Sequence, residues 1–160
     1  MFSAKEVLSQ TNEILFNQMP GGTFVSMFYI IFDANENELT FSQAGHPPAF
    51  LIRSNKKEVL KLTTNGTLIG IFPNKHASFE EKKIQLFPGD KILLYTDAII
   101  EAFSKKGEMF DLSDLEQTLK EHIDLPIDQL LEEVYQHGLE FSGKESYDDD
   151  ATLVGFEVLD

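Results

Sequence analysis

Apolar residues recur at helical spacing at the start of the chain, and they predict an amphipathic helix over residues 4–18. The apolar face is carried by Val7, Leu8, Thr11, Ile14 and Leu15. Ser3 is a suitable N-cap, and Glu6 three residues later completes a capping box. The sequence Pro20-Gly21-Gly22 ends the predicted helix, because neither residue type continues one well.

From Thr23 onward the pattern changes to apolar runs and alternation, which are typical of β-strands. Roughly seven strands in antiparallel order are predicted, over residues 23–32, 38–43, 49–53, 58–62, 81–86, 90–96 and 151–158. The first is too apolar for a strand with one wet face, so we expect a central strand covered on both sides. The turn at 33–37 makes a hairpin of the first two strands.

Helical periodicity returns after the sixth strand. It predicts a short helix or turn over 99–103, a helix over 112–122 and a helix of about 16 residues that starts at Pro126. Helices that lie before and after a run of strands favour an α+β fold, with helices packed on sheets. The connection over 63–80 is long, and no repeat or linker divides the chain, so residues 1–160 are predicted to form a single domain.

Composition narrows the class of protein. The chain has 160 residues, a formal net charge of −14 and no cysteine, which excludes disulfides, zinc–thiolate sites and cysteine nucleophiles. The negative charge disfavours nucleic acid and anionic membranes as partners, although it can also serve solubility alone. No apolar stretch approaches the roughly 20 residues of a membrane span, and Lys5 and Glu6 interrupt any signal-peptide core. We therefore expect a cytoplasmic protein without membrane insertion.

Two acidic clusters are the strongest candidates for chemistry. Asp97 follows a buried strand, and Asp148-Asp149-Asp150 comes directly before the last strand. Carboxylates at strand ends, without cysteine, favour Mg²⁺ or Mn²⁺. Each cluster also has a structural interpretation: Asp97 can cap the turn that follows it, and the three aspartates can form an acidic surface turn. His46, in a Gly-His-Pro-Pro corner, is interpreted as a structural residue.

Five motifs occur in an order that is specific to one family; no P-loop, G-x-S-x-G or G-x-G-x-x-G motif accompanies them. They are TFVSMFY at 23–29, AGHPP at 44–48, Gly66-x-x-x-Gly70, PGDKILLYTD at 88–97 and DDDATL at 148–153. With these motifs the chain resembles the bacterial SpoIIE-type branch of the PPM (protein phosphatase 2C-like) metal-dependent serine/threonine phosphatases.

The resemblance implies an α-β-β-α sandwich of antiparallel sheets, with a two-metal Mn²⁺ or Mg²⁺ centre that activates a water for attack on phosphoserine or phosphothreonine. By motif position, Asp97 and Asp149 correspond to metal ligands, Asp150 to a supporting neighbour and Thr152 to a structural residue at the start of the strand. No catalytic residue beyond the metal ligands is implied.

Two departures from the family pattern stand out. Ala98 replaces the usual glycine after the first acid, which is a mild change but one that can strain a corner suited to glycine. The early Asp motifs of the family have no counterpart, so the chain resembles the C-terminal two-thirds or so of the domain, N-terminally incomplete. We therefore expect weak or no metal binding and little activity in the isolated chain. We also expect unpaired sheet edges, which a homodimer or a rearranged fold would have to cover.

Two principal hypotheses follow for the function. The first is a phosphatase domain acting on a phosphorylated protein, in this branch typically a STAS-type anti-sigma-factor antagonist in partner-switching signalling. The second is a non-catalytic interaction module with a degenerate phosphatase fold. Upstream sequence that carries the early Asp motifs would favour the enzyme, whereas a natural start at Met1 would favour the module. A calcium-binding module is disfavoured because no EF-hand spacing is present.

Overall fold

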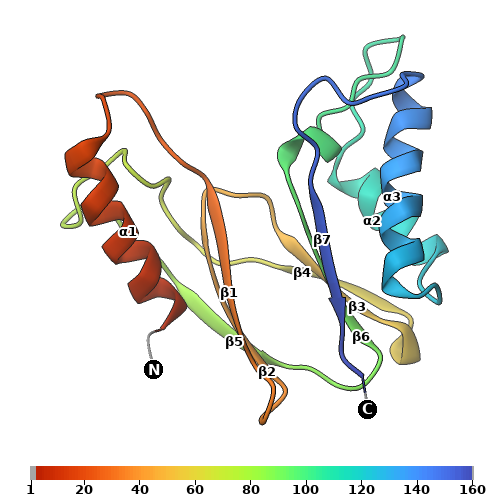
Figure 1. Ribbon diagram of the computed structural model, residues 1–160, viewed down its shortest axis with the longest axis horizontal. Helices are drawn as coiled ribbons and strands as arrows, with labels where there is room; N and C mark the ends of the chain where they lie inside the picture. Colours follow the sequence, from red (N-terminus) through yellow and green to blue (C-terminus); the bar gives the residue numbers. More distant parts are fainter. Residues whose placement is uncertain (1–2, 160) are drawn as a thin grey trace. The chain divides into compact units, whose positions relative to one another are not determined.

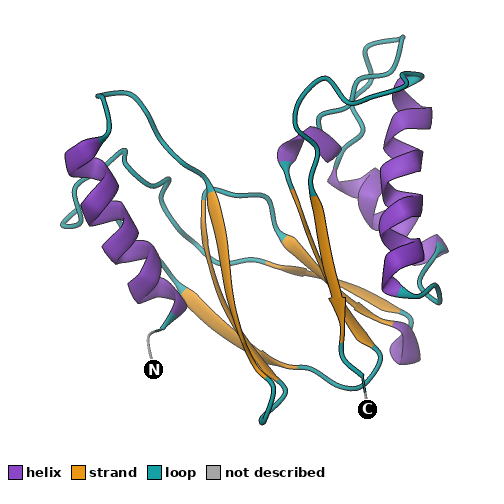
Figure 2. Cartoon of the chain, in the orientation of Figure 1, coloured by secondary structure: helices purple, strands orange, loops and turns teal. Residues whose placement is uncertain are grey.

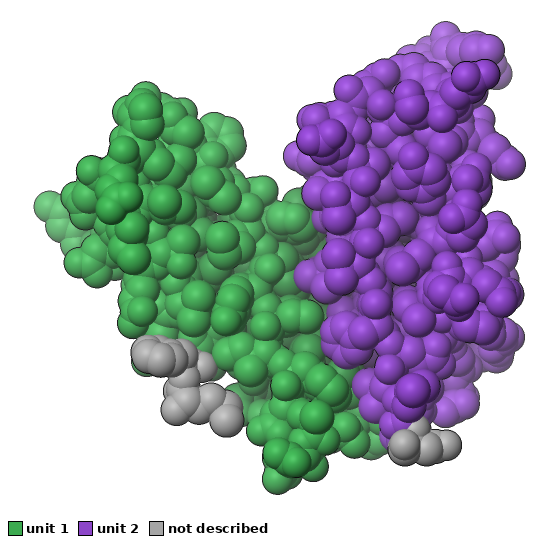
Figure 3. Space-filling model, in the orientation of Figure 1, with its two compact units in different colours: residues 1–48, 62–87 green, residues 49–61, 88–160 purple. Residues whose placement is uncertain are grey.

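The computed structural model describes residues 3–159, which contain three α-helices, two short 3₁₀ helices and seven β-strands (Figures 1 and 2). The strands form one three-stranded sheet and one four-stranded sheet. The predicted α+β class is therefore confirmed. The chain divides into two compact units, unit 1 with residues 1–48 and 62–87 and unit 2 with residues 49–61 and 88–160 (Figure 3).

Unit 1 contains helix α1 (Ala4–Gln18) and a sheet of order β1-β2-β5. The strands are β1 (Met27–Asp33), β2 (Glu38–Ala44) and β5 (Glu81–Gln85), and both pairs are antiparallel. The hairpin predicted for the first two strands is present. The first strand is nevertheless an edge strand with mostly half-buried residues, so the prediction of a central strand covered on both sides is wrong. Its apolar run could not reveal which neighbours it pairs with.

Helix α1 begins and ends where the sequence predicts. Ser3 Oγ accepts a hydrogen bond from the Glu6 amide, and Glu6 Oε2 accepts one from the Ser3 amide, which confirms the capping box. The helix turns Ala4, Leu8 and Asn12 inward, and all three are buried.

Asn12 joins this helix to the long 63–80 connection. Its side chain donates to the Phe72 carbonyl (3.0 Å) and accepts a hydrogen bond from the Gly70 amide (2.8 Å). A buried amide side chain needs such partners, because an unsatisfied polar group in the interior costs about 1–3 kcal/mol. The connection is thus held to the helix by specific contacts.

Unit 2 contains a sheet of order β4-β3-β6-β7. The strands are β3 (Ala49–Arg53), β4 (Glu58–Leu62), β6 (Asp90–Tyr95) and β7 (Leu153–Glu157). Strand β6 lies between β3 and β7 and is antiparallel to both. It is buried along nearly its whole length, as its apolar run predicts.

Helices α2 (Leu112–Glu121) and α3 (Ile127–Ser142) pack on this sheet and close the main core of unit 2. The core contains Phe50, Leu93, Phe110, Leu115, Leu119, Leu130 and Val134, all fully buried. Burial of each large apolar side chain contributes about 1.5–3 kcal/mol, so this cluster holds strand β6 firmly against the helices. The elements that carry both acidic clusters therefore extend from one rigid body.

Candidate functional site

The two acidic clusters lie at neighbouring strand ends in unit 2. Strand β6 runs antiparallel to β7, and Tyr95 at the end of β6 pairs with Leu153 at the start of β7. Asp97 follows Tyr95 by two residues, and Asp149 precedes Leu153 by four. Antiparallel neighbours place the end of one strand beside the beginning of the next. Residues 52 apart in the sequence (149 minus 97) are thereby brought to one edge of the sheet.

Thr96 links these two strand ends through three hydrogen bonds. Its amide donates to the Thr152 carbonyl (3.0 Å), and its hydroxyl accepts a hydrogen bond from the Thr152 amide (2.9 Å). The same hydroxyl donates to the Asp150 carbonyl (3.0 Å). We call these three contacts the Thr96 clamp. The clamp ties the backbone just before Asp97 to the backbone just after Asp149.

Asp97 is the first residue of a 3₁₀ turn, η2 (Asp97–Ile99). Its Oδ1 accepts a hydrogen bond from the Ala98 amide (3.0 Å), and its carbonyl accepts from the Ile100 and Glu101 amides. Among the described residues, the non-glycine positions with positive φ are Asn37 and Lys57, so the corner at Ala98 carries no left-handed strain. The expectation that alanine would strain this corner is wrong, because the turn here is right-handed.

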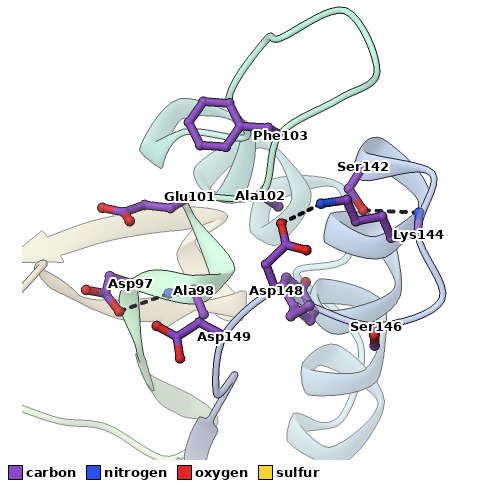
Figure 4. Close-up of a pocket in the computed structure, with 11 residues that line it drawn as sticks. Asp97, Ala98, Glu101, Ala102, Phe103, Ser142, Lys144, Ser146, Asp148 and Asp149 are labelled. Carbon is purple, nitrogen blue, oxygen red and sulfur yellow. Dashed lines mark hydrogen bonds and ion pairs between the residues drawn. The ribbon is translucent and has the colours of Figure 1, made fainter.

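The three consecutive aspartates have different surroundings. Asp148 forms an ion pair with Lys144, whereas Asp149 Oδ1 accepts a hydrogen bond from the Asp150 amide (2.8 Å). Figure 4 shows the Asp148 carboxylate turned toward Lys144 and the Asp149 carboxylate turned toward the side of Asp97. Asp150 is held through its backbone by the Thr96 clamp and does not line the pocket described next.

A pocket of about 240 Å³ lies between the turn after β6 and the segment before β7 (Figure 4). One side is lined by Asp97, Ala98, Glu101, Ala102 and Phe103, and the other by Ser142, Lys144, Ser146, Tyr147, Asp148 and Asp149. Four acidic residues and a single lysine therefore line one small volume. All of these residues belong to unit 2.

Tyr147 lines the pocket and connects the pocket to helix α3. Its hydroxyl donates to the Tyr135 carbonyl (3.0 Å), and the two rings lie 5.1 Å apart. Burial, with a smaller contribution from Tyr135, raises the pKa of the Tyr147 hydroxyl to about 12. Burial likewise raises the pKa of Tyr95, whose hydroxyl has no hydrogen-bond partner within residues 3–159. Both rings therefore stay neutral at ordinary pH and act as packing groups.

His46 has local contacts within unit 1. Its Nδ1–H donates to the Pro47 carbonyl (2.9 Å), and its ring lies edge-on to Phe28 at 6.2 Å. The Gln43 side chain donates to the His46 carbonyl. These contacts hold the Gly-His-Pro-Pro corner after strand β2, and they suit the structural interpretation of this histidine.

The carboxylate oxygens of the pocket are the type of ligand that a hard divalent cation prefers. Asp97 and Asp149 offer carboxylate oxygens at the same small volume, as Mg²⁺ and Mn²⁺ prefer. Across residues 3–159, however, no three or more histidine, cysteine, aspartate or glutamate side chains are grouped closely enough to hold a metal ion. The type of ligand fits, and the number of ligands within the described residues is short of a full coordination sphere.

Sequence reasoning found the acids but missed several pocket residues. Lys144, Phe103 and Tyr147 line the pocket together with the acids. The Thr96 clamp joins the two segments that carry Asp97 and Asp149. The hydroxyl of Thr96, between a buried strand and Asp97, was a usable signal, because polar side chains at strand ends often bond to neighbouring backbone. Lys144 gave no comparable signal, since an exposed lysine after a helix is common.

The fold and the pocket together define a class of protein. A solved structure of the SiaA-PP2C domain of Pseudomonas aeruginosa matches 98% of this chain and 61% of its own, with a TM-score of 0.83 and 19% identity. A structure of RsbU and RsbW domains from Mycobacterium tuberculosis matches 98% of this chain and 42% of its own, with a TM-score of 0.79 and 24% identity. The fold is thus that of PPM phosphatase domains, as predicted.

The family assignment rests on a match over residues 2–159 to the family described as stage II sporulation protein E (SpoIIE). The chain belongs to this family. It is 23% identical over 149 residues to the phosphoserine phosphatase RsbU of Bacillus subtilis, and the match covers 93% of this chain and 44% of RsbU. The chain therefore spans less than half the length of this curated relative. No helix within residues 3–159 is long and apolar enough to cross a membrane.

Proposed function

We propose that this chain is the part of a metal-dependent protein serine/threonine phosphatase that supplies Asp97 and Asp149 to the metal centre. The observation that supports the proposal most strongly is that both carboxylates line one pocket at the joined ends of β6 and β7. The family match and the name of RsbU, a phosphoserine phosphatase, support the same reaction class.

In this proposal the chain's own residues bind and orient. Asp97 and Asp149 would hold Mn²⁺ or Mg²⁺, with Asp150 in support through the backbone, and the Thr96 clamp would keep both acids at the pocket. A divalent cation bound there would lower the pKa of a water and offset the negative charge of the phosphate. The remaining ligands would have to come from outside the pocket described above.

The substrate is proposed to be a phosphorylated protein, with a STAS-type anti-sigma-factor antagonist as the candidate partner in the partner-switching setting implied by the RsbU likeness. A protein substrate suits a pocket at the surface, since the lining residues Asp97, Asp148 and Asp149 are all exposed. The net charge of −14 disfavours nucleic acid as an alternative substrate. Cytoplasmic location and a homodimer remain part of the proposal.

The reaction is tested by hydrolysis of a phosphoserine peptide with Mn²⁺, using the natural gene product that contains this chain. Asp97→Asn and Asp149→Asn are each expected to lower kcat/KM by about a hundredfold or more, because a neutral amide is a much weaker ligand. Asp124→Asn is the matched control, since Asp124 is an exposed aspartate of unit 2 that does not line the pocket. Full activity in both pocket variants would refute the assignment.

A second candidate is a non-catalytic interaction module with the same fold. It is favoured because no three potential metal ligands are grouped within residues 3–159. We propose that the isolated 160-residue chain binds Mn²⁺ weakly and hydrolyses little substrate. Calorimetric titration with Mn²⁺ separates the cases: micromolar affinity in this chain alone would contradict the proposal of an incomplete centre. Inactivity of both this chain and the natural gene product at saturating Mn²⁺ would favour the interaction module.

A further inference from the structure

Lys144 is the single cation among the residues that line the pocket. Its ammonium group forms an ion pair with Asp148, on the same wall of the pocket (Figure 4). The family resemblance and the metal-ligand assignments leave this lysine without a role. The pocket contains it together with Asp97 and Asp149, so an anion bound at those acids through a cation would lie in the same 240 Å³ volume.

The backbone of Lys144 is held by hydrogen bonds, whereas its side chain is partly exposed. Helix α3 ends at Ser142 and is capped by Gly143, which is left-handed at φ 64°. The Lys144 amide donates to the Leu139 carbonyl and to Ser142 Oγ, both at 3.3 Å. Ser142 is itself buried. These contacts form the usual C-terminal motif of a helix. The lysine stem thus starts from a rigid point at the rim of the pocket.

The ion pair with Asp148 is a weak restraint. The Lys144 side chain is 42% exposed and that of Asp148 is 72% exposed, and exposed ion pairs contribute little to stability. A phosphoryl group or a buried carboxylate offers stronger charge-assisted hydrogen bonds than a solvated aspartate does. An anionic oxygen of a ligand can therefore compete with Asp148 for the lysine.

We propose that Lys144 is a specificity-determining residue that leaves Asp148 to bind an anionic oxygen of the phosphoprotein substrate. The oxygen belongs to the phosphoryl group itself or to a carboxylate that flanks the phosphoserine. Asp148 serves as the resting partner of the lysine in the empty pocket. This inference rests on the proposed phosphatase function and adds the substrate contact to it.

The test compares two variants that break the same ion pair. Lys144→Met is expected to raise KM for a phosphoserine peptide about tenfold with little change in kcat, whereas Lys144→Arg restores most of the affinity. Asp148→Asn frees the lysine, so KM should stay unchanged or fall. Lys105→Met is the matched control, because Lys105 lies against the same helix end at Gly143 but does not line the pocket.

The source of the anionic oxygen is distinguished with two further substrates. If Lys144 binds the phosphoryl group, Lys144→Met also raises KM for p-nitrophenyl phosphate. If it binds a flanking carboxylate, the effect is confined to peptides with glutamate beside the phosphoserine and disappears when glutamine replaces it. Equal effects of Lys144→Met and Asp148→Asn, or no effect of Lys144→Met on any substrate, would overturn the proposal in favour of a purely structural pair.

A binding measurement keeps this proposal separate from the phosphatase assignment. Two probes are titrated into wild type and Lys144→Met at saturating Mn²⁺. One is inorganic phosphate, and the other is the peptide with glutamate beside the phosphoserine, in a form that is not hydrolysed. Weaker binding of either probe to the variant supports the role of Lys144 even if the wild type hydrolyses nothing, which would refute only the proposed reaction. Hydrolysis by the wild type together with unchanged binding and KM in the variant refutes only the role of Lys144.

Discussion

At the scale of single residues, Thr96 does the most to place the acids. Its hydroxyl accepts a hydrogen bond from the Thr152 amide and donates one to the Asp150 carbonyl, so one oxygen joins the end of β6 to the segment before β7. The paired residues of β6 and β7 end at Tyr95 and Leu153, and the Thr96 amide adds one further backbone hydrogen bond, to the Thr152 carbonyl. The two hydroxyl contacts act beside this bond, at the position where the segments with Asp97 and Asp149 leave the sheet.

Replacement of Thr96 by valine tests this residue. Thr96→Val keeps the shape but removes both hydroxyl contacts, so we expect a loss of about 0.5–1.5 kcal/mol in the free energy of unfolding. Mn²⁺ affinity of the natural gene product should fall as well, because the segment with Asp149 becomes less restrained. Urea unfolding and calorimetry measure the two effects. Thr96→Ser retains the hydroxyl and serves as the control; if it and valine behave alike, the clamp does not position the site.

At the scale of elements, helix α3 supports the segment that carries the aspartates. Tyr147 folds back onto the helix, where its hydroxyl reaches the Tyr135 carbonyl. Space for this contact exists because residue 138 is glycine: a Cβ added there would lie 2.1 Å from the Tyr147 hydroxyl oxygen. A glycine that weakens the helix interior thus allows the 143–150 segment to dock against it.

Substitution of Gly138 tests that docking. By helix propensity alone, Gly138→Ala would stabilise by about 0.8–1 kcal/mol. The added methyl group must displace the rigid Tyr147 ring, so we expect a net loss of about 1–2 kcal/mol, measured by thermal or urea unfolding. Gly21→Ala is the control, since nothing lies within 4 Å of a Cβ at Gly21. A Gly138→Ala protein more stable than wild type would show that Tyr147 is not held by α3.

At the scale of the whole molecule, charge is the dominant property. Aspartate and glutamate number 27 against 13 lysines and arginines. Such an excess destabilises the folded state through self-repulsion and favours the binding of cations in general. Any stabilisation by a divalent metal must therefore be separated from simple screening.

Ionic strength makes this separation possible. A change from about 0.01 M to about 0.15 M NaCl shortens the Debye length from about 30 to about 8 Å. We expect the Tm of the chain to rise by a few degrees, about 2–4 °C for each kcal/mol of repulsion removed. Choline chloride at the same concentration should act equally if screening alone is responsible. A Tm that falls or stays constant with salt would exclude self-repulsion as a significant term.

How much of this structure could be predicted depended on the range of the interactions. The bounds of α1, of β3 and of β4 were predicted to the residue, because capping, turns and alternation are local. The position of β1 in its sheet was mispredicted, since an apolar run does not identify its neighbours. The strain expected at Ala98 did not appear, because the family's glycine indicates a preference and not the φ of this turn.

The sequence by itself determined the fold class and the family, and it proposed Asp97 and Asp149 as ligands, because ordered motifs and periodicity are properties of the chain alone. Only the tertiary structure decided that the two acids lie in the same pocket. Pairing of β6 with β7, the Thr96 clamp and the fold-back of Tyr147 on α3 place them in one pocket with Lys144. Contacts between residues about 50 apart depend on strand order and packing, which local patterns do not encode.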